Sequence, residues 1–207
     1  MQMSDEEIVA KILSGETRLY EKLMRKYNQQ LYRISMSIIN DDKEAEDIMQ
    51  TAYLNAFRQL KNFQQRSSFA TWLTRILINE SLLHKKRKQK HEQTLMENNY
   101  TDHDDNTPLD GLMNKELKLL LERAVSSLPE KYRLVFVMRE VQGMSTNETM
   151  EVLNIGESNV KIRLTRAKDM LRTELNSYWQ PQELYEFNLV RCDVIVNYVM
   201  GEVLKSN

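Results

Sequence analysis

Residues 144–172 constrain the fold more than any other stretch, because two helical patterns meet there at a short break. Ser145 and Glu148 have the spacing of a capping box, which predicts that a helix begins at Ser145. Asn154, Ile155 and Gly156 interrupt the pattern, and a glycine permits a sharp turn between two crossing helices. We therefore expect a helical hairpin with its turn at residues 154–156.

The second helix of this hairpin, expected over residues 157–176, is amphipathic. Its apolar arc consists of Val160, Leu164, Ala167 and Leu171. The opposite side carries Ser158, Ile162 and Thr165, flanked by Lys161, Arg166 and Lys168. A helix that is buried on one side, with small polar and basic residues on the other, suits the major groove of DNA. An amphipathic hairpin with a solvated basic face has the same pattern, so this stretch leaves both interpretations open.

The composition favours an all-helical protein of two small domains. The 207 residues include only five glycines and three prolines, and helix-forming residue types are abundant. Helical patterns cover residues 5–14, 16–39, 44–60, 69–88, 112–126, 130–141, 145–153 and 157–176, and none alternates like a strand. The N-terminus is acidic and no apolar run reaches membrane-spanning length. We therefore expect a cytoplasmic protein without membrane insertion.

The net charge of −1 conceals an uneven distribution of charge. Residues 84–91 contain five Lys or Arg, whereas residues 92–111 contain six acidic residues and no Lys or Arg. A stretch this polar buries too little apolar surface to order itself, so we expect a flexible acidic linker over residues 92–111. It divides the chain into a first domain, 1–91, and a second, 112–176, followed by a helical extension, 177–207. The basic run by itself is explained as well by a solvated cluster of charges.

The helix expected over residues 44–60 has a core face and one leucine outside it. The core face consists of Ala45, Ile48, Met49, Ala52, Tyr53, Ala56, Phe57 and Leu60. Leu54 lies off this arc, among Asp47, Gln50, Thr51 and Arg58. One exposed leucine needs no explanation, yet a leucine centred in a polar patch is typical of a protein-docking surface.

Residues 61–88 combine a polar loop, aromatic residues and the basic run. Phe69 and Trp72 begin a helix, after a loop that contains Arg66, Ser67 and Ser68. Aromatic side chains beside a basic track suit single-stranded nucleic acid, because stacking contributes roughly 1–3 kcal/mol per base. A core helix that runs into a solvated basic end is the alternative.

The order of these parts resembles the extracytoplasmic-function subgroup of the sigma-70 family of RNA polymerase sigma factors, over roughly residues 6–90 and 112–174. Residues 44–57 are similar to the family's polymerase-clamp-binding helix. Residues 63–87, with the run FATWLTR at 69–75, are similar to the part that opens the −10 promoter element. The run LPEKYR at 128–133 and the helix-turn-helix after it are similar to the domain that reads the −35 element. No large domain separates the two halves, which favours the minimal subgroup.

The resemblance implies roles for individual residues. The clamp of core RNA polymerase would be met by Asp47, Gln50, Thr51, Leu54 and Arg58. The −10 element would be contacted by Lys61, Arg66, Ser67, Ser68, Trp72 and Asn79, with Lys85, Lys86, Arg87 and Lys88 on adjacent phosphates. The −35 element would be contacted by Ser158, Lys161, Ile162, Thr165, Arg166 and Lys168. Thr165 stands where some relatives have an aromatic residue, which leaves the preferred −35 sequence open.

The sequence thus predicts a transcription initiation factor that binds core polymerase, recognises both promoter elements and helps to melt DNA. Its other expected partner is an anti-sigma factor that clamps the two halves together. No catalytic residue, metal or cofactor is expected, because no nucleophile–base pair or metal-ligand spacing is present. The alternative is a helix-turn-helix repressor or activator whose first domain binds an effector or dimerises. A helical adaptor without nucleic-acid contact would leave both basic helices unexplained.

Overall fold

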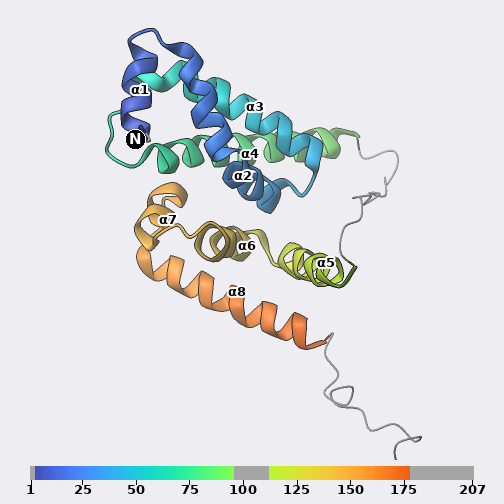
Figure 1. The fold of residues 1–207 in the computed structure, drawn as a ribbon. Coiled ribbons are helices and arrows are strands. Elements are labelled where there is room, and N and C mark those ends of the chain that lie inside the picture. Colours follow the sequence, from blue (N-terminus) through green and yellow to red (C-terminus); the bar gives the residue numbers. More distant parts are fainter. Residues whose placement is uncertain (1–2, 96–111, 178–207) are drawn as a thin grey trace, which may run out of the picture. The chain divides into compact units, whose positions relative to one another are not determined.

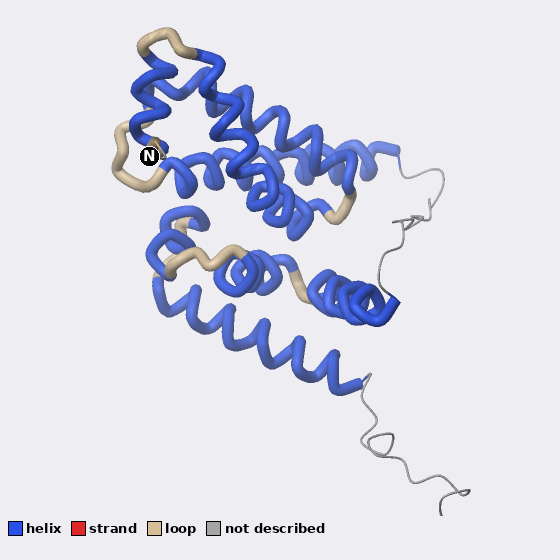
Figure 2. The backbone as a smooth tube through the Cα atoms, in the orientation of Figure 1, coloured by secondary structure: helices blue, strands red, loops and turns tan. Residues whose placement is uncertain are grey.

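The computed structural model describes residues 3–95 and 112–177, and these residues form α-helices joined by short loops (Figure 2). No strand occurs among them, so the all-helical prediction is confirmed for the described part of the chain. The remainder of the predicted linker, residues 96–111, and the predicted extension from residue 178 onward lie outside the described residues.

The first group of helices comprises α1 (Asp5–Leu13), α2 (Tyr20–Ile39), α3 (Asp42–Gln59) and α4 (Phe69–Leu95), with short 3₁₀ turns η1 (Thr17–Leu19) and η2 (Leu60–Asn62) (Figure 1). Helices α2, α3 and α4 pack against one another. Their shared core is apolar. Its fully buried residues include Leu23, Leu31, Ala52, Ala56 and Leu77. The periodic apolar residues of each helix therefore meet in one core, as an amphipathic pattern requires.

The second group comprises α5 (Leu112–Ser127), α6 (Glu130–Phe136), the π-helical turn η3 (Val137–Val141), α7 (Thr146–Leu153) and α8 (Glu157–Ser177). Pro129 is the N-cap of α6, a position where its missing N–H removes no helical hydrogen bond. The described residues up to Leu171 belong to one compact unit. Within it, Arg133 donates from Nε to the carbonyl of Ser37 at 2.7 Å, and Arg75 lies 3.8 Å from the carboxylate of Glu151.

The capping box predicted at Ser145 is present and begins α7. The backbone N–H of Ser145 donates to the Glu148 carboxylate at 2.7 Å, and the N–H of Glu148 donates to the Ser145 hydroxyl at 3.1 Å. The turn lies where it was predicted, but the predicted residue, Gly156, does not make it. Asn154 ends α7 with a φ of 50°, whereas the φ of Gly156 is not positive. Asparagine tolerates this left-handed conformation at a helix end, so the turn does not need the glycine.

Three helix boundaries differ from the predicted ones by more than two residues. The segment 16–39 begins with the 3₁₀ turn η1 before α2. The segment 130–141 ends in the π-helical turn η3. Helix α4 continues to Leu95 and so enters the predicted linker, because Gln89, Lys90 and Glu92 are residue types of high helix propensity.

Candidate protein and nucleic-acid interfaces

The first candidate interface is the outer face of α3. All five residues predicted for it, namely Asp47, Gln50, Thr51, Leu54 and Arg58, are exposed. Leu54 is 57% exposed, which confirms that it lies off the core face. Phe57 was predicted to be core but is 39% exposed, although its ring packs on that of Tyr20 with the centroids 5.1 Å apart. Leu54 and Phe57 together give this face an apolar centre within a polar surround.

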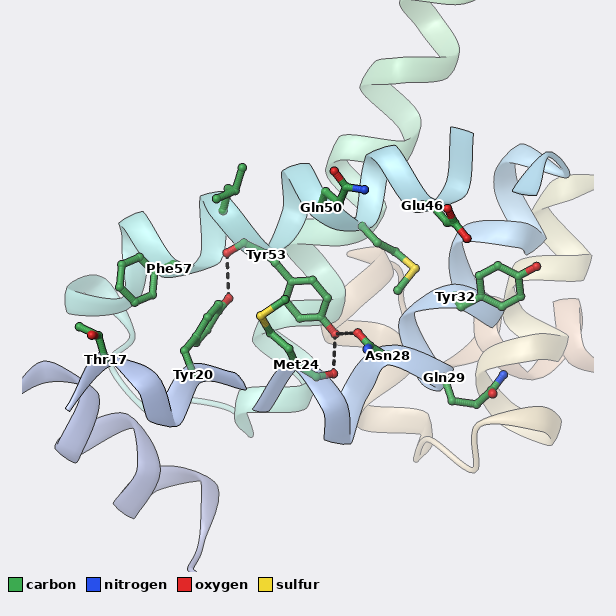
Figure 3. Close-up of a pocket in the computed structure, with 12 residues that line it drawn as sticks. Thr17, Tyr20, Met24, Asn28, Gln29, Tyr32, Glu46, Gln50, Tyr53 and Phe57 are labelled. Atoms are coloured by element: carbon green, nitrogen blue, oxygen red, sulfur yellow. Dashed lines mark hydrogen bonds between the residues drawn. The ribbon is translucent and has the colours of Figure 1, made fainter. Parts of the chain in front are cut away.

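A groove of about 810 Å³ runs along this face between α2 and α3 (Figure 3). Thr17 and Phe57 lie at one end and Tyr32 and Glu46 at the other, as Figure 3 shows. The residues lining it also include Tyr20, Met24, Asn28, Gln29, Met49, Gln50, Tyr53 and Leu54. Its lining is thus mostly apolar and aromatic, with polar groups toward the Glu46 end, which suits the apolar stripe of a partner helix.

Two tyrosines fix the floor of the groove. The Tyr20 hydroxyl donates to the carbonyl of Tyr53 at 2.8 Å, and the Tyr53 hydroxyl contacts the carbonyl of Met24 at 3.0 Å and the Asn28 side chain at 2.9 Å (Figure 3). Burial raises the pKa of both tyrosines far above the usual value of about 10, so both remain neutral. These bonds hold α2 and α3 together beneath the apolar surface. At the Glu46 end of the groove, the hydrogen bond from Tyr32 to Asp42 raises the pKa of Tyr32 to about 12, and partial burial of the Tyr32 hydroxyl adds to this effect.

The second candidate interface is the loop 61–68 with the start of α4. Ser68 caps α4: its hydroxyl accepts from the N–H of Thr71 at 3.1 Å and its carbonyl accepts from the N–H of Trp72 at 3.1 Å. The Trp72 ring lies 5.1 Å from Phe63 and 5.7 Å from Phe69, so it is half-buried in an aromatic cluster. Lys61 and Arg66 are exposed, Ser67 is half-buried, and Asn79 is exposed further along α4.

The basic run on α4 is partly neutralised by carboxylates that sequence spacing could not identify. Glu44 of α3 contacts Lys88 at 2.6 Å and His84 at 3.1 Å. Lys85 pairs with Glu130. Lys86 and Arg87 are exposed and form no ion pair with the described residues. Lys86 and Arg87 are therefore the cations of this run that are most available to bind a phosphate.

The third candidate interface is the outer face of α8. Of the predicted apolar arc, Val160, Ala167 and Leu171 are buried and Leu164 is half-buried, and Ile162 is 50% exposed on the other side. The residues predicted to contact DNA, namely Ser158, Lys161, Ile162, Thr165, Arg166 and Lys168, are all exposed. A groove-binding helix needs this arrangement, with one face anchored in the domain and the other free for base edges.

Three of the cations of α8, namely Lys161, Arg166 and Lys168, have partners within the chain. Lys161 lies 2.6 Å from Glu157 and lowers the pKa of that carboxyl. Lys168 lies 2.9 Å from Glu140. Arg166 donates to the hydroxyl of Tyr132 at 3.3 Å, and this bond is the largest cause lowering the pKa of Tyr132. The sequence did not predict these contacts, of which the bond between α6 and α8 orients Arg166 across the helix surface.

Two other kinds of site find no support in the described residues. Residues 3–95 and 112–177 contain no group of three or more His, Cys, Asp or Glu side chains arranged to hold a metal ion. Within the same ranges, no helix is both long and apolar enough to cross a bilayer.

Comparison with known proteins assigns a family to each half of the chain. Residues 23–91 match the model described as Sigma-70 region 2, and residues 118–171 match the model described as Sigma-70, region 4. The first match contains α3 and the basic run of α4, and the second contains the helix-turn-helix. Together the two matches span more than half of the chain.

Curated relatives and solved structures agree with these matches. The chain is 26% identical to RNA polymerase sigma-H factor of Pseudomonas aeruginosa over 82% of this chain and 93% of that one. It is 27% identical to ECF RNA polymerase sigma factor SigW of Bacillus subtilis, over 84% and 98% respectively. The fold is similar to that of RpoE bound to the anti-sigma factor NepR from Bartonella quintana, with a TM-score of 0.66, 18% identity and coverage of 76% and 96%. It is also similar to CnrH in complex with the cytosolic domain of CnrY, with a TM-score of 0.62, 21% identity and coverage of 84% and 99%.

The two region models occur in this chain in the order that the sequence motifs predicted, and the curated relatives are covered over nearly their whole length. The chain belongs to the sigma-70 family of RNA polymerase sigma factors, in its extracytoplasmic-function subgroup.

Proposed function

We propose that this sigma factor binds core polymerase through the outer face of α3, opens the −10 element with the loop 61–68 and α4, and reads the −35 element with α8. The observation that carries the proposal is the exposure of the α3 and α8 residue sets, and of most of the −10 set, on elements that fall within the matched regions. The proposed domains are 1–91 and 112–176. We propose that the protein acts in the cytoplasm, without direct insertion into a membrane.

The α3 face has the make-up of a protein interface. Leu54 and Phe57 form its apolar centre, and Asp47, Gln50 and Arg58 form a polar rim. The groove between α2 and α3 adds concave apolar surface beside Leu54. A helical partner such as the polymerase clamp would bury Leu54, and a buried interface centre of this kind carries most of the binding energy.

The loop 61–68 and α4 are suited to a melted strand. Extruding a base from the duplex costs a few kcal/mol, which stacking and pocket contacts must offset. Arg66 and Ser67 supply hydrogen-bond donors beside the aromatic cluster of Phe63 and Trp72. Lys86 and Arg87 extend the track for adjacent phosphates without reading the sequence.

On α8, two kinds of contact with the −35 element are available. Ile162 and Thr165 are exposed on the outer face and can make apolar contacts with thymine methyl groups or single hydrogen bonds. Lys161 and Lys168 already have carboxylate partners, so a phosphate must replace Glu157 or Glu140. The lysines would therefore position the helix on the backbone, and the sequence preference would come from Ile162, Thr165 and Arg166.

An inhibitor protein is the further partner that we propose. The similar structures of CnrH and RpoE are complexes with CnrY and with the anti-sigma factor NepR. In this chain the α2–α3 groove and the α8 face are both open to a partner. A protein that covers the groove would compete with polymerase, and transcription would then follow its release.

Run-off transcription with purified core polymerase tests the proposed function. A library of random duplexes supplies the template, and the products are sequenced. We expect transcripts with a shared pair of upstream elements only when both core polymerase and this chain are present. If transcript start sites are the same without the chain, the proposed function is wrong.

A further inference from the structure

Gln65 has a backbone conformation that its position does not explain. Among the described residues, three that are not glycine have a positive φ: Asn40, Gln65 and Asn154. The two asparagines end α2 and α7, where a left-handed residue commonly terminates a helix. Gln65, with a φ of 55°, lies in the loop between η2 and α4 and ends no helix. A residue type that rarely adopts this conformation occupies it in the loop that we assign to the −10 element.

The loop is anchored at both of its ends. At its start, the N–H of Phe63 donates to the carbonyl of Leu60 at 3.1 Å, and the Phe63 ring packs on Trp72 and Phe69. At its end, Ser68 caps α4. Gln65 is an exposed residue between these anchors. Since both ends are fixed, the left-handed backbone of Gln65 contributes to the direction in which Arg66 and Ser67 follow it.

We propose that Gln65 is a positioning residue whose left-handed backbone presents Arg66 and Ser67 to the unstacked non-template base; this inference rests on the proposed function of the loop. The conformation costs free energy in a non-glycine residue, and strain of this kind persists where the surroundings determine it and is enriched at functional sites. The Gln65 side chain itself makes no contribution to base recognition.

Three substitutions at position 65 separate the backbone from the side chain. Gln65→Gly removes the side chain and permits the conformation, Gln65→Asn tolerates it with a shorter amide, and Gln65→Val disfavours it because valine is β-branched. The template is a promoter selected by the wild-type holoenzyme and then randomised in its −10 region. The readout is the base preference at each −10 position among open complexes. Melting temperature, core-polymerase affinity and preference at the −35 element are measured in parallel.

We expect Gln65→Val to reduce the −10 base preference about tenfold, and the glycine and asparagine variants to stay within about twofold of the wild type. The melting temperature, the affinity for core polymerase and the −35 preference should be unchanged in all three variants, because Gln65 is exposed and lies outside the core. An equal loss in Gln65→Gly and Gln65→Val would mean that the side chain makes the contact, and would overturn the inference. A wild-type preference in Gln65→Val would overturn it as well.

A double variant, Arg66→Ala with Ser67→Ala, separates this inference from the proposed function. If it retains the wild-type −10 preference, the loop does not read the element and the proposed function of the loop is wrong. If it loses the preference while Gln65→Val keeps it, only the positioning role of Gln65 fails.

Discussion

Single residues acquire their roles here from exposure and long-range partners as much as from their type. Leu54 and Leu60 are both leucines of one helical stretch, yet the first is 57% and the second 1% exposed. The wheel of α3 predicted this contrast, because burial repeats with the helical period. The pairing of Glu44 with Lys88 could not be predicted from the sequence, because the two residues are 44 positions apart and meet only through the packing of α3 on α4.

Leu54→Asp tests the proposed docking face. A carboxylate at the centre of an apolar interface lacks a partner, so we expect the affinity for core polymerase to fall by a factor of roughly 30 or more. The melting temperature should change little, because Leu54 is exposed in the free protein. Leu13→Asp is the matched control, an equally drastic change at a leucine that is 47% exposed on α1. Unfolding of the Leu54 variant, or equal losses in both variants, would contradict the assignment.

At the scale of elements, local signals predicted most helix limits, and the exceptions are the 3₁₀ turn before α2, the π-helical turn after α6 and the extension of α4. The capping box of α7 and Pro129 before α6 can be read from neighbouring residues. The left-handed Asn154, the half-exposed Phe57 and the bond from Arg166 to Tyr132 depend on how helices cross. Exposure of the predicted residues on α3 and α8 could be derived from periodicity, and the Glu157–Lys161 pair has i,i+4 spacing. The partners of Lys85 and Lys168 are distant in the sequence and could not be derived from it.

Glu148→Gln tests the capping box that begins the helix-turn-helix. The N–H of Ser145 donates to the Glu148 carboxylate and lowers its pKa, so the charged form is favoured in the folded protein. This contribution is complete above the ordinary pKa of about 4.3 and is lost as the pH falls through the lowered pKa. We expect the variant to unfold about 1 kcal/mol more easily at neutral pH. In urea unfolding at decreasing pH, the difference from the wild type should vanish; a difference independent of pH would contradict the assigned bond.

Lys161→Ala and Arg166→Ala test the outer face of α8. Each cation that meets a phosphate adds about one unit to the slope of log affinity against log salt, so Lys161→Ala should reduce that slope by roughly one, whereas Arg166→Ala should also relax the base preference at the −35 element. The measurement is the salt dependence of promoter binding by the reconstituted holoenzyme. Lys118→Ala on α5, which removes an exposed lysine paired with Glu122, is the control and should leave the slope unchanged. Wild-type affinity in the double variant would remove α8 from the DNA interface.

For the whole molecule, the distribution of charge matters more than its sum. With a net charge of −1, the chain has little overall attraction for DNA, and its cations are concentrated on α4 and α8. Several of these cations are paired with carboxylates of the same chain. Stable promoter binding therefore requires further contacts and the correct placement of both faces, which we assign to core polymerase.

The most direct test of this account is the affinity for one selected promoter duplex, measured by fluorescence anisotropy with the chain alone and with the chain bound to core polymerase. We expect the chain alone to bind this duplex no better than a scrambled one, and the holoenzyme to prefer it by at least about a hundredfold. A repressor or activator of the helix-turn-helix type would behave differently. Tight, sequence-specific binding by the chain alone, unchanged by core polymerase, would contradict the account.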